Sequence, residues 1–520
     1  MREFAHPVLT RRQLLGTSAA AVAASVLPPV ARAQAAKYRR WEITDPAMPA
    51  RVLTSYKTGI GKMLALPPAH PLNWYRNAFI HLLDCPHGNW WFLVWHRAYL
   101  GRLEITLRQL SGDPEFALPY WDWTKAPRVP AAMFEGVLDP NNPGYIATID
   151  QFRASFDARV SAMYNQFSRA QNAMLARRGV GSTTEFWDAI TDPTGPMFFN
   201  QPNARGLTVA NPDLDPTTKV AVSAPTIESA LGVPYFAGSP SGPDQAGFGS
   251  AIATSHSDGS RQGILESQPH NLVHNAMGGP DGLAFMVNFR PIFFLHHGNI
   301  DRLWDVWTRK QIAQGRSALP VGADYVRWAD EQFLFFNPNG TPTDAGYYAN
   351  ANMTIFDYDY SPGFGEDEAR APAAVVAALP AARRFSASIE AGAAGGVVQL
   401  PSAALRPLTR GAPPRVAEIT LDLDHSDQGR RFRVLVSAAG GSPVVAGGIA
   451  PFGHVHGPMT FTVPLPENIG AGAAAGANVP LDIRVVPVEP AAGASPAAAA
   501  RMAARAAIPA PVTAITVHTN

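Results

Sequence analysis

Apolar residues in the first two thirds of the chain recur with the period of α-helices. Residues 72–83, "LNWYRNAFIHLL", and residues 90–112, "WWFLVWHRAYLGRLEITLRQLSG", both follow this pattern. In the second segment Leu100, Leu103 and Leu107 share one helical face, and Gly112 marks the expected helix end. The pattern predicts a mainly helical part between about residues 37 and 360.

The period changes after residue 384. Apolar and polar residues alternate in "EITLDLDH", "RRFRVLVSA", "MTFTVPLP" and "LDIRVVPV", as they do in strands. These segments predict a small β-sandwich over residues 385–520. It contains an Ala-rich insertion at 490–511 that is expected to be disordered or loosely helical. Residues 362–384 combine turn-forming, charged and Ala-rich stretches, so they are predicted to be a linker.

Residues 1–33 have the pattern of an export signal rather than of a folded element. Arg11 and Arg12 precede a short apolar stretch, and small residues suggest cleavage after Ala33. The stretch is broken by Pro28 and Pro29 and is too short to span a bilayer. We expect a twin-arginine-type signal peptide and export to the periplasm or beyond. An ordinary secretory signal or a disordered tail is the alternative.

Composition narrows the choice of partners. The chain has 520 residues, of which 46% are hydrophobic, so it can form sizeable cores. The formal net charge is +1, which does not favour nucleic acid as a partner, and no other segment is apolar enough to suggest a membrane. A single cysteine excludes an intrachain disulfide. The oligomeric state is left open.

Seven of the fourteen histidines fall into two clusters. His270 and His274 are four residues apart, so they point the same way on a helix. His87 and His96 are nine apart, about 180° around a helix, so His87 is assigned to the loop before the helix that carries His96. The first cluster contains His81, His87 and His96, and the second contains His270, His274, His296 and His297.

These clusters suggest a metal site. A single buried histidine is usually a core residue, but burying so many imidazoles is costly unless something binds them. Imidazole suits zinc, copper, iron and nickel. Few carboxylates and one cysteine lie nearby, which argues against non-haem iron and most zinc sites. Two groups of three histidines therefore predict two copper ions between facing helices of a bundle.

Several stretches resemble the type-3 copper tyrosinase and polyphenol oxidase (catechol oxidase) family. They are "IHLLDCPHGNWWFLVWHRAYL", "LPYWDW", "PHNLVH" and "FFLHHGNIDRLW", in this order, and the similarity covers about residues 50–360. "FDYDY", with Tyr358 and Tyr360, resembles the tyrosine motif that closes the family's catalytic domain. The resemblance implies a four-helix-bundle dicopper domain at 34–361. Residues 385–520 resemble the C-terminal β-domain of plant-type members, a possible latency shield.

The resemblance also implies the ligands. His81, His87 and His96 would hold the first copper, and His270, His274 and His297 the second. His297 is preferred to His296 because the family places this histidine four residues before an aspartate, here Asp301. His296 would then be a hydrogen-bonded core residue. Cys85 matches a cysteine that relatives join by a thioether to the second histidine, here His87. A free buried thiol is the alternative.

Three further residues match functional positions of relatives. Glu266 and Asn271 would hold a water that helps to deprotonate a phenol, although Glu266 could equally serve only the helix start. Phe289 would be an aromatic gate over the second copper, or a core residue. Arg290 stands where relatives have aspartate, and four or five residues are missing after Phe289. We therefore expect weaker binding of the second copper and slow catalysis.

The implied activity is copper-dependent oxidation of o-diphenols to o-quinones by O2, with monophenols as a further substrate class. Two alternatives stay open. One is a haemocyanin-like oxygen-binding protein, and the other is a copper-deficient relative of low activity.

Overall fold

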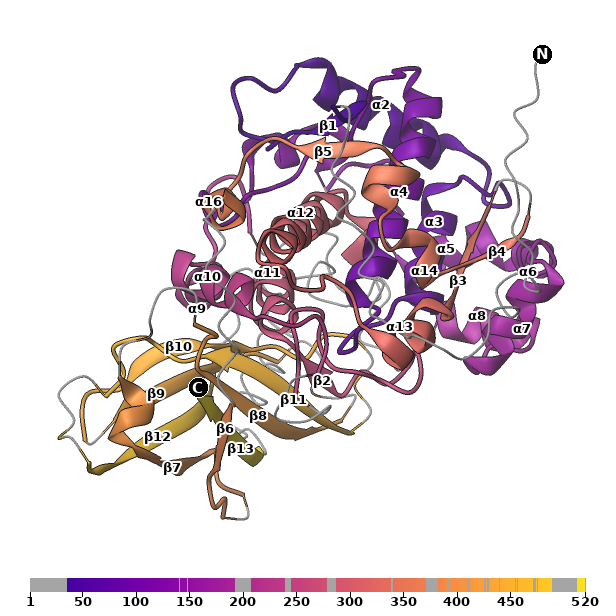
Figure 1. Ribbon diagram of the computed structural model, residues 1–520. Coiled ribbons are helices and arrows are strands. Elements are labelled where there is room, and N and C mark those ends of the chain that lie inside the picture. Colours follow the sequence, from indigo (N-terminus) through magenta and orange to yellow (C-terminus); the bar gives the residue numbers. More distant parts are fainter. Residues whose placement is uncertain are drawn as a thin grey trace, which may run out of the picture. The chain divides into compact units, whose positions relative to one another are not determined.

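A computed structural model describes residues 35–191, 207–277, 287–370 and 382–488 with short gaps, and residues 512–519 (Figure 1). Residues 1–33, the predicted signal peptide, and the whole Ala-rich insertion at 490–511 lie outside this range. Residues 34–520 form one compact unit. Among the described residues, no helix is long and apolar enough to cross a membrane.

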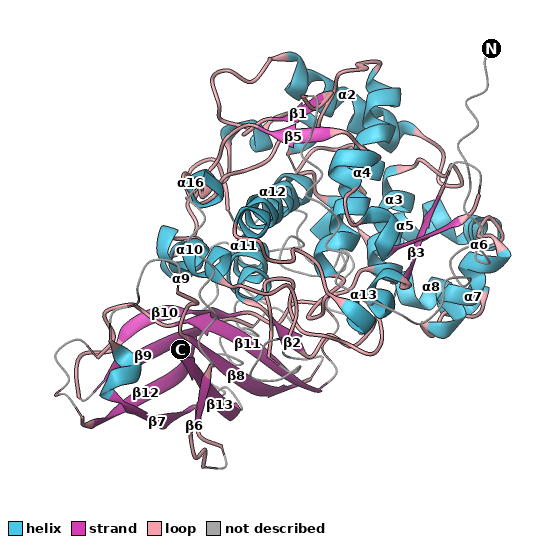
Figure 2. Cartoon of the chain, in the orientation of Figure 1, coloured by secondary structure: helices cyan, strands magenta, loops and turns pink. Residues whose placement is uncertain are grey.

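Helices dominate the chain as far as residue 370 (Figure 2). The longest are α4 (Phe92–Ser111) and α12 (Ile292–Ala313), with α2 (Arg51–Ala65) and α3 (Trp74–Asp84) beside them. The shorter helices are α5 (Ile149–Phe156), α6 (Val160–Tyr164), α7 (Arg169–Arg177), α8 (Thr183–Thr191), α9 (Pro216–Ala221), α10 (Ala224–Gly232), α11 (Asn271–Met277), α13 (Gly322–Ala329), α14 (Ala345–Tyr348), α15 (Ala351–Thr354) and α16 (Glu366–Arg370).

Local sequence explains both ends of the helices that carry the first histidine cluster. At the start of α3, the side chain of Asn73 accepts hydrogen bonds from two backbone N–H groups of the first turn. Helix α4 ends at Gly112, whose φ of 79° is easily adopted only by glycine. Leu100, Leu103 and Leu107 are all buried, as the pattern predicted.

Helix α11 begins irregularly. Residues Glu266–His270 form one turn of π-helix that runs directly into α11, and Pro269 lies inside it. Proline cannot donate the backbone hydrogen bond of a regular α-helix, which favours such a local widening. The turn belongs to the helix that carries His270 and His274.

Two sheets form the C-terminal part, which confirms a helical region followed by a β-domain. One has the order β10-β9-β12-β7 and the other β2-β11-β8-β13-β6. Apolar side chains from both sheets share one core, with Val434, Leu481, Ile419 and Phe461 among them. The strands are β6 (Arg383–Ser386), β7 (Gly395–Pro401), β8 (Val416–Leu423), β9 (Phe432–Ala438), β10 (Val444–Ile449), β11 (Gly457–Pro464), β12 (Asn478–Pro487) and β13 (Val512–Thr519).

One strand of the second sheet comes from the helical part of the chain. Strand β2 (Arg261–Gln262) pairs in parallel with β11, Arg261 opposite Thr460 and Gln262 opposite Phe461. Two small sheets, β1 (Tyr38–Arg40) with β5 (Tyr358–Tyr360) and β3 (Gln332–Phe336) with β4 (Pro342–Asp344), lie within the helical part. The chain order did not predict that the sandwich includes residues 261 and 262.

The predicted linker is only partly described. Helix α16 lies inside it, and Arg309 and Lys310 of α12 form ion pairs with Glu366 and Glu368 of α16. Residues 371–381 lie outside the described range. The exact domain boundaries stay predictions.

Candidate metal centre

The first group of predicted ligands comes together around the start of α4. His81 lies on α3, His96 lies on α4, and His87 lies on the loop between these helices. The possible ligand atoms of these histidines and of Cys85 all lie within 4.8 Å of one another, and all four residues are buried. The loop position of His87 agrees with the spacing argument.

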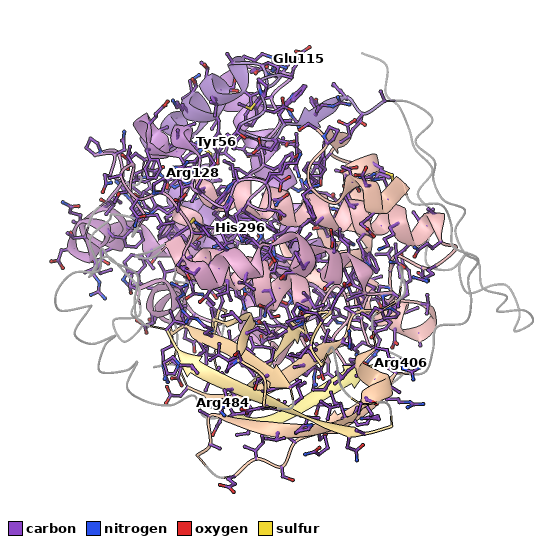
Figure 3. All side chains as sticks on the ribbon, turned by 90° about the vertical axis from the view of Figure 1, so that its left-hand side faces the viewer. Tyr56, Glu115, Arg128, His296, Arg406 and Arg484 are labelled. Atoms are coloured by element: carbon purple, nitrogen blue, oxygen red, sulfur yellow. The ribbon has the colours of Figure 1, made fainter. Side chains whose placement is uncertain are left out.

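The second group joins α11 and α12. His270 closes the π-turn and His274 follows it on α11, whereas His296 and His297 lie on α12. Their ligand atoms also lie within 4.8 Å of one another, and none of the four has an exposed side chain. Figure 3 shows His296 in the interior, while labelled residues such as Glu115 and Arg484 lie at the periphery.

The protonation of His96 prepares one nitrogen for a metal. Its Nδ1 lies 2.7 Å from the backbone oxygen of Phe92. A carbonyl only accepts, so Nδ1 carries the proton and Nε2 keeps its lone pair. That lone pair faces the first group, where Cys85 Sγ lies 3.3 Å away.

The second group contains nitrogens that the protein leaves without hydrogen bonds. Nε2 of His270 and Nδ1 of His297 have no hydrogen-bond partner among the described residues. Nε2 of His274 and Nε2 of His297 lie 3.1 Å apart. Two imidazole nitrogens that bind one ion at about 2.0 Å take roughly this separation. The donor set therefore fits a metal ion.

Burial keeps these imidazoles neutral. It lowers the pKa of His96 to about 3, against the opposing effect of the Phe92 carbonyl. Burial, and then the neighbouring imidazoles, lower the pKa values of His270, His274 and His297 well below the ordinary value. Neutral imidazole is the form that binds metals.

The two groups lie side by side. The rings of His96 and His297 stack with centroids 4.1 Å apart and planes 9° from parallel. The next residue after His96, Arg97, donates to Asp301 over 2.7 Å, one turn after His297 on α12. This buried pair holds α4 against α12 at the level of the two groups.

Asp301 also accepts hydrogen bonds from both tyrosines of the predicted tyrosine motif. The hydroxyls of Tyr358 and Tyr360 both donate to it, and Arg40 forms an ion pair with it. Burial by itself would raise the pKa of Asp301, but Arg97 and Arg40 bring it below the ordinary value. The motif therefore closes the helical part by fixing the middle of α12.

Asn271 orients an imidazole. Its side-chain oxygen accepts from Nδ1 of His270 over 2.7 Å, and its amide nitrogen donates to Oε1 of Gln262 over 2.6 Å. Nε2 of His270 is thereby left for a metal. Gln262 lies on β2 and has no signal of its own in the sequence.

Glu266 is a buried carboxyl group close to the loop of His87. One oxygen accepts the backbone N–H of Gly88 over 2.6 Å, and the other accepts the hydroxyl of Ser250. Burial raises the pKa of Glu266 to about 8, although both hydrogen bonds oppose this. An acid with a shifted pKa beside a metal-ligating loop suits proton transfer.

Cys85 lies against the imidazole of His87. Its Sγ is 3.7 Å from Nδ1 and 3.7 Å from Nε2 of that ring. The sulfur therefore lies in contact with this imidazole ring. Burial, and then the negative charge of Glu266, raise the pKa of the thiol well above its ordinary value.

A phenylalanine from the β-domain covers both groups. The ring of Phe452 stacks on His274 at 4.5 Å and lies edge-on to His270 at 5.2 Å and to His87 at 5.3 Å. The next residue, Gly453, has a φ of 94°, and a Cβ there would lie 2.8 Å from Cβ of His87. Glycine lets the chain approach this closely. Periodicity gave no sign of Phe452, which lies three residues after the end of β10 in a turn-rich stretch.

Phe289 and Arg290 lie where α12 begins. The Phe289 ring packs edge-on against Tyr75, with ring centroids 5.1 Å apart. The ring of Phe293, not that of Phe289, packs against His297, with centroids 4.2 Å apart. Arg290 is buried, its guanidinium 5.6 Å from the ring centre of Tyr145. Residues 278–286 lie outside the described range. The gate role of Phe289 stays a prediction.

The N-cap position of α12 supplies no capping side chain. The residue before it is Pro291, which makes no capping hydrogen bond. Instead, two carbonyl groups are anchored: Tyr56 donates to Pro291 over 2.7 Å, and the Trp74 indole donates to Phe289 over 3.0 Å. His296 accepts from the Trp123 indole over 3.1 Å, in agreement with an anchored core imidazole.

Two adjacent groups of buried imidazoles on facing helices define a binuclear metal protein, and both groups fit copper. Residues 63–310 match the common central domain of tyrosinase. The helical part of the chain therefore belongs to the tyrosinase and polyphenol oxidase family.

Relatives agree with this assignment. A tyrosinase from Hahella is 29% identical over 289 residues, which are 54% of this chain and 48% of that protein. A chloroplastic polyphenol oxidase from Spinacia oleracea is 26% identical over 318 residues, 56% of this chain and 42% of its own. The chain thus spans about half the length of the curated relatives it matches.

Solved structures share the fold. Latent apple tyrosinase superposes with a TM-score of 0.52 at 18% identity, covering 94% of this chain and 97% of that one. A latent aurone synthase gives a TM-score of 0.54 at 18% identity, with coverages of 94% and 90%. Both likenesses include the helical part and the β-domain.

Proposed function

We propose that the protein oxidises o-diphenols to o-quinones with O2 at a binuclear copper site, with monophenols as a further substrate class. His81, His87 and His96 would hold one copper, and His270, His274 and His297 the other. The observation that carries the proposal is the adjacency of two buried imidazole groups, joined by the stacked rings of His96 and His297. Family membership supports it.

The bound copper ions would supply electron exchange between the phenol and O2. Each o-diphenol loses two electrons and two protons. Two turnovers therefore reduce one O2 to two waters. The protein supplies a dry, fixed ligand frame, which we assign to a four-helix bundle of α3, α4, α11 and α12.

Glu266 would accept a proton from the phenol, directly or through a water held with Asn271. The carboxyl must be ionised for this. Its pKa of about 8 in the metal-free protein reflects burial, and two nearby copper charges would lower it. Glu266→Gln should reduce kcat much more than it changes copper content.

Cys85 would be joined to His87 by a thioether. The closeness of Sγ to both ring nitrogens of His87 supports this. Forming the C–S bond removes one hydrogen from each partner, and O2 would accept the two electrons and the two protons. The bond would fix the imidazole and protect the thiol from oxidation.

The β-domain would act as a shield. Phe452 occupies the space against His274, His270 and His87 that a phenol ring would need. A phenol then gains access only when this side chain moves. Two solved relatives of the same fold are described as latent.

Oxygen consumption tests the activity. The copper-loaded protein should take up O2 when catechol is added and should form o-quinone in a 1:2 ratio of O2 to product. Reversible O2 binding without catechol turnover would instead indicate a haemocyanin-like carrier. We also propose export, with residues 1–33 as a twin-arginine-type signal peptide.

A further inference from the structure

We propose that the β-domain is a structural part of the second copper site, with Gln268 as the positioning residue through which it acts. The inference rests on the proposed function. It goes beyond shielding, because it concerns how the ligand segment before His270 is held rather than how the site is covered.

The side chain of Gln268 leaves the π-turn and enters the β-domain. Its amide nitrogen donates to the backbone oxygen of Gly448 over 3.0 Å and to that of Thr462 over 3.2 Å. Its oxygen accepts the N–H of Gly448 over 3.2 Å. Gln268 is completely buried, so these three backbone groups replace water.

Glycines in strand β10 leave the space that the side chain of Gln268 occupies. Gly447 and Gly448 lie on β10, and a Cβ at position 447 would collide with the side-chain oxygen of Gln268. Glycine inside a strand often marks a close approach of this kind. The adjacent Ser267 donates its hydroxyl to Thr462 as well, so two successive residues of the π-turn are held by β10 and β11.

A second connection reaches the imidazole itself. Gln262 is part of β2, which pairs with β11, and its backbone oxygen accepts the hydroxyl of Thr462 over 2.7 Å. Its side chain then holds Asn271, which holds Nδ1 of His270. The β-domain thus fixes the backbone before His270 through Gln268 and the ring orientation of His270 through Gln262.

Among the described residues, the hydrogen bonds of Gln268 and Gln262 lead to His270 and not to the helices of the first group. His96 is oriented by Phe92 of its own helix, and His81 lies on α3. Loosening the contact between the π-turn and the β-domain should therefore affect the second copper before the first. Changes around a metal ligand typically cost 10- to 100-fold in metal affinity.

The test measures copper per chain in the full-length protein, by competition with a chelator. Gln268→Met keeps the volume of the side chain and removes its hydrogen bonds. We expect the second copper to bind about 10- to 100-fold more weakly and the first to be unchanged. The control is Arg484→Ala, which removes an exposed ion pair with Asp482 within β12.

A second variant distinguishes positioning from a general loss of folding. Gln262→Met removes the hydrogen bond to Asn271 and leaves the hydrogen bonds between Gln268 and the strands in place. The second copper should again bind more weakly, whereas binding of the first copper should match the wild type. A general loss of folding would weaken both.

Each outcome has a clear meaning. Two equally tight coppers in Gln268→Met and in Gln262→Met would overturn the positioning role. An equal loss in Arg484→Ala would overturn it too. A wild-type protein that binds no copper would instead refute the proposed function.

Discussion

The ring of Phe452 lies flat on that of His274, with planes 6° from parallel and centroids 4.5 Å apart. One side chain of the β-domain thereby occupies the face of a second-group imidazole, and its edges reach His270 and His87. Several expectations follow from this arrangement and from the two imidazole groups beneath it.

Removing the ring should open the site. Phe452→Ala is expected to raise kcat/KM for bulky catechols by an order of magnitude or more and for catechol itself by less. The lost packing costs up to about 3–5 kcal/mol of unfolding free energy, so rates should be measured well below the melting temperature. Phe385→Ala, on the distant edge strand β6, is the control. Unchanged rates in Phe452→Ala would mean that this ring does not limit access.

Metal content should follow the two groups. Wild-type protein loaded with copper is expected to bind two ions per chain. His87→Ala should lose mainly the first copper, and His274→Ala mainly the second, because each removes one of three ligands. Elemental analysis after removal of free metal measures this. One zinc and no copper would contradict the proposed centre.

Cys85 should become unreactive when the copper site matures. A thioether to His87 lowers the mass of the joined peptides by two hydrogens. The copper-matured protein should therefore resist thiol reagents even in denaturant, whereas protein made without copper should be labelled. Complete labelling of matured, unfolded protein would exclude the bond.

The metal-free protein should be sensitive to acid. The pKa of His96 is lowered to about 3 by burial, and those of His270, His274 and His297 lie well below 6.5. Between these values and 6.5 only the unfolded chain binds the protons, so stability falls as pH decreases from 6.5. Each such histidine lowers the free energy of unfolding by about 1.4 kcal/mol for each pH unit of acidification in this range.

Glu266 has the opposite effect on the pH dependence of stability, because it lowers the free energy of unfolding as pH rises. Its raised pKa of about 8 means that the folded protein holds a proton that the unfolded chain releases above about 4.5, so its contribution falls as pH rises toward 8. Urea unfolding from pH 5 to 8 should therefore show the histidine effect at the acid end, and Glu266→Gln should remove the loss at the alkaline end. A flat profile for the metal-free protein would contradict both assignments.

The second copper should be the weaker one. Helix α12 starts without a capping side chain, and a lost cap costs roughly 0.5–2 kcal/mol. Inserting a serine-containing loop with Asp-Pro between Phe289 and Ile292 should raise both occupancy of the second copper and turnover. Tight binding of both ions in the wild type, together with slower turnover after insertion, would show that the short segment is an adaptation.

The sequence predicted the features that depend on nearby residues. The apolar face and the glycine end of α4, the loop position of His87, and the alternating strands of the sandwich all follow from spacing within a few residues. The histidines were recognisable because two clusters of one residue type are improbable in a core without a ligand.

The missing features depend on residues far apart in the chain. A two-residue strand such as β2 is too short for any periodic pattern, and its partner strand begins roughly 200 residues later. Phe452 sits among turn residues, where an aromatic side chain gives no indication of what it contacts. Gln268 looks like an ordinary polar helix residue until β10 is placed against it.

The pairing of β2 with β11 also sets an order of events during synthesis. Arg261 can pair only after Thr460 has been synthesised, roughly 200 residues later. At usual elongation rates this delay is about 10–40 s. Until then, the π-turn before His270 lacks the partners of Gln268. The first histidine group depends on α3 and α4 and can assemble early. Nascent chains should therefore acquire their two metal ions in sequence, and a chain truncated before residue 457 should stop after the first.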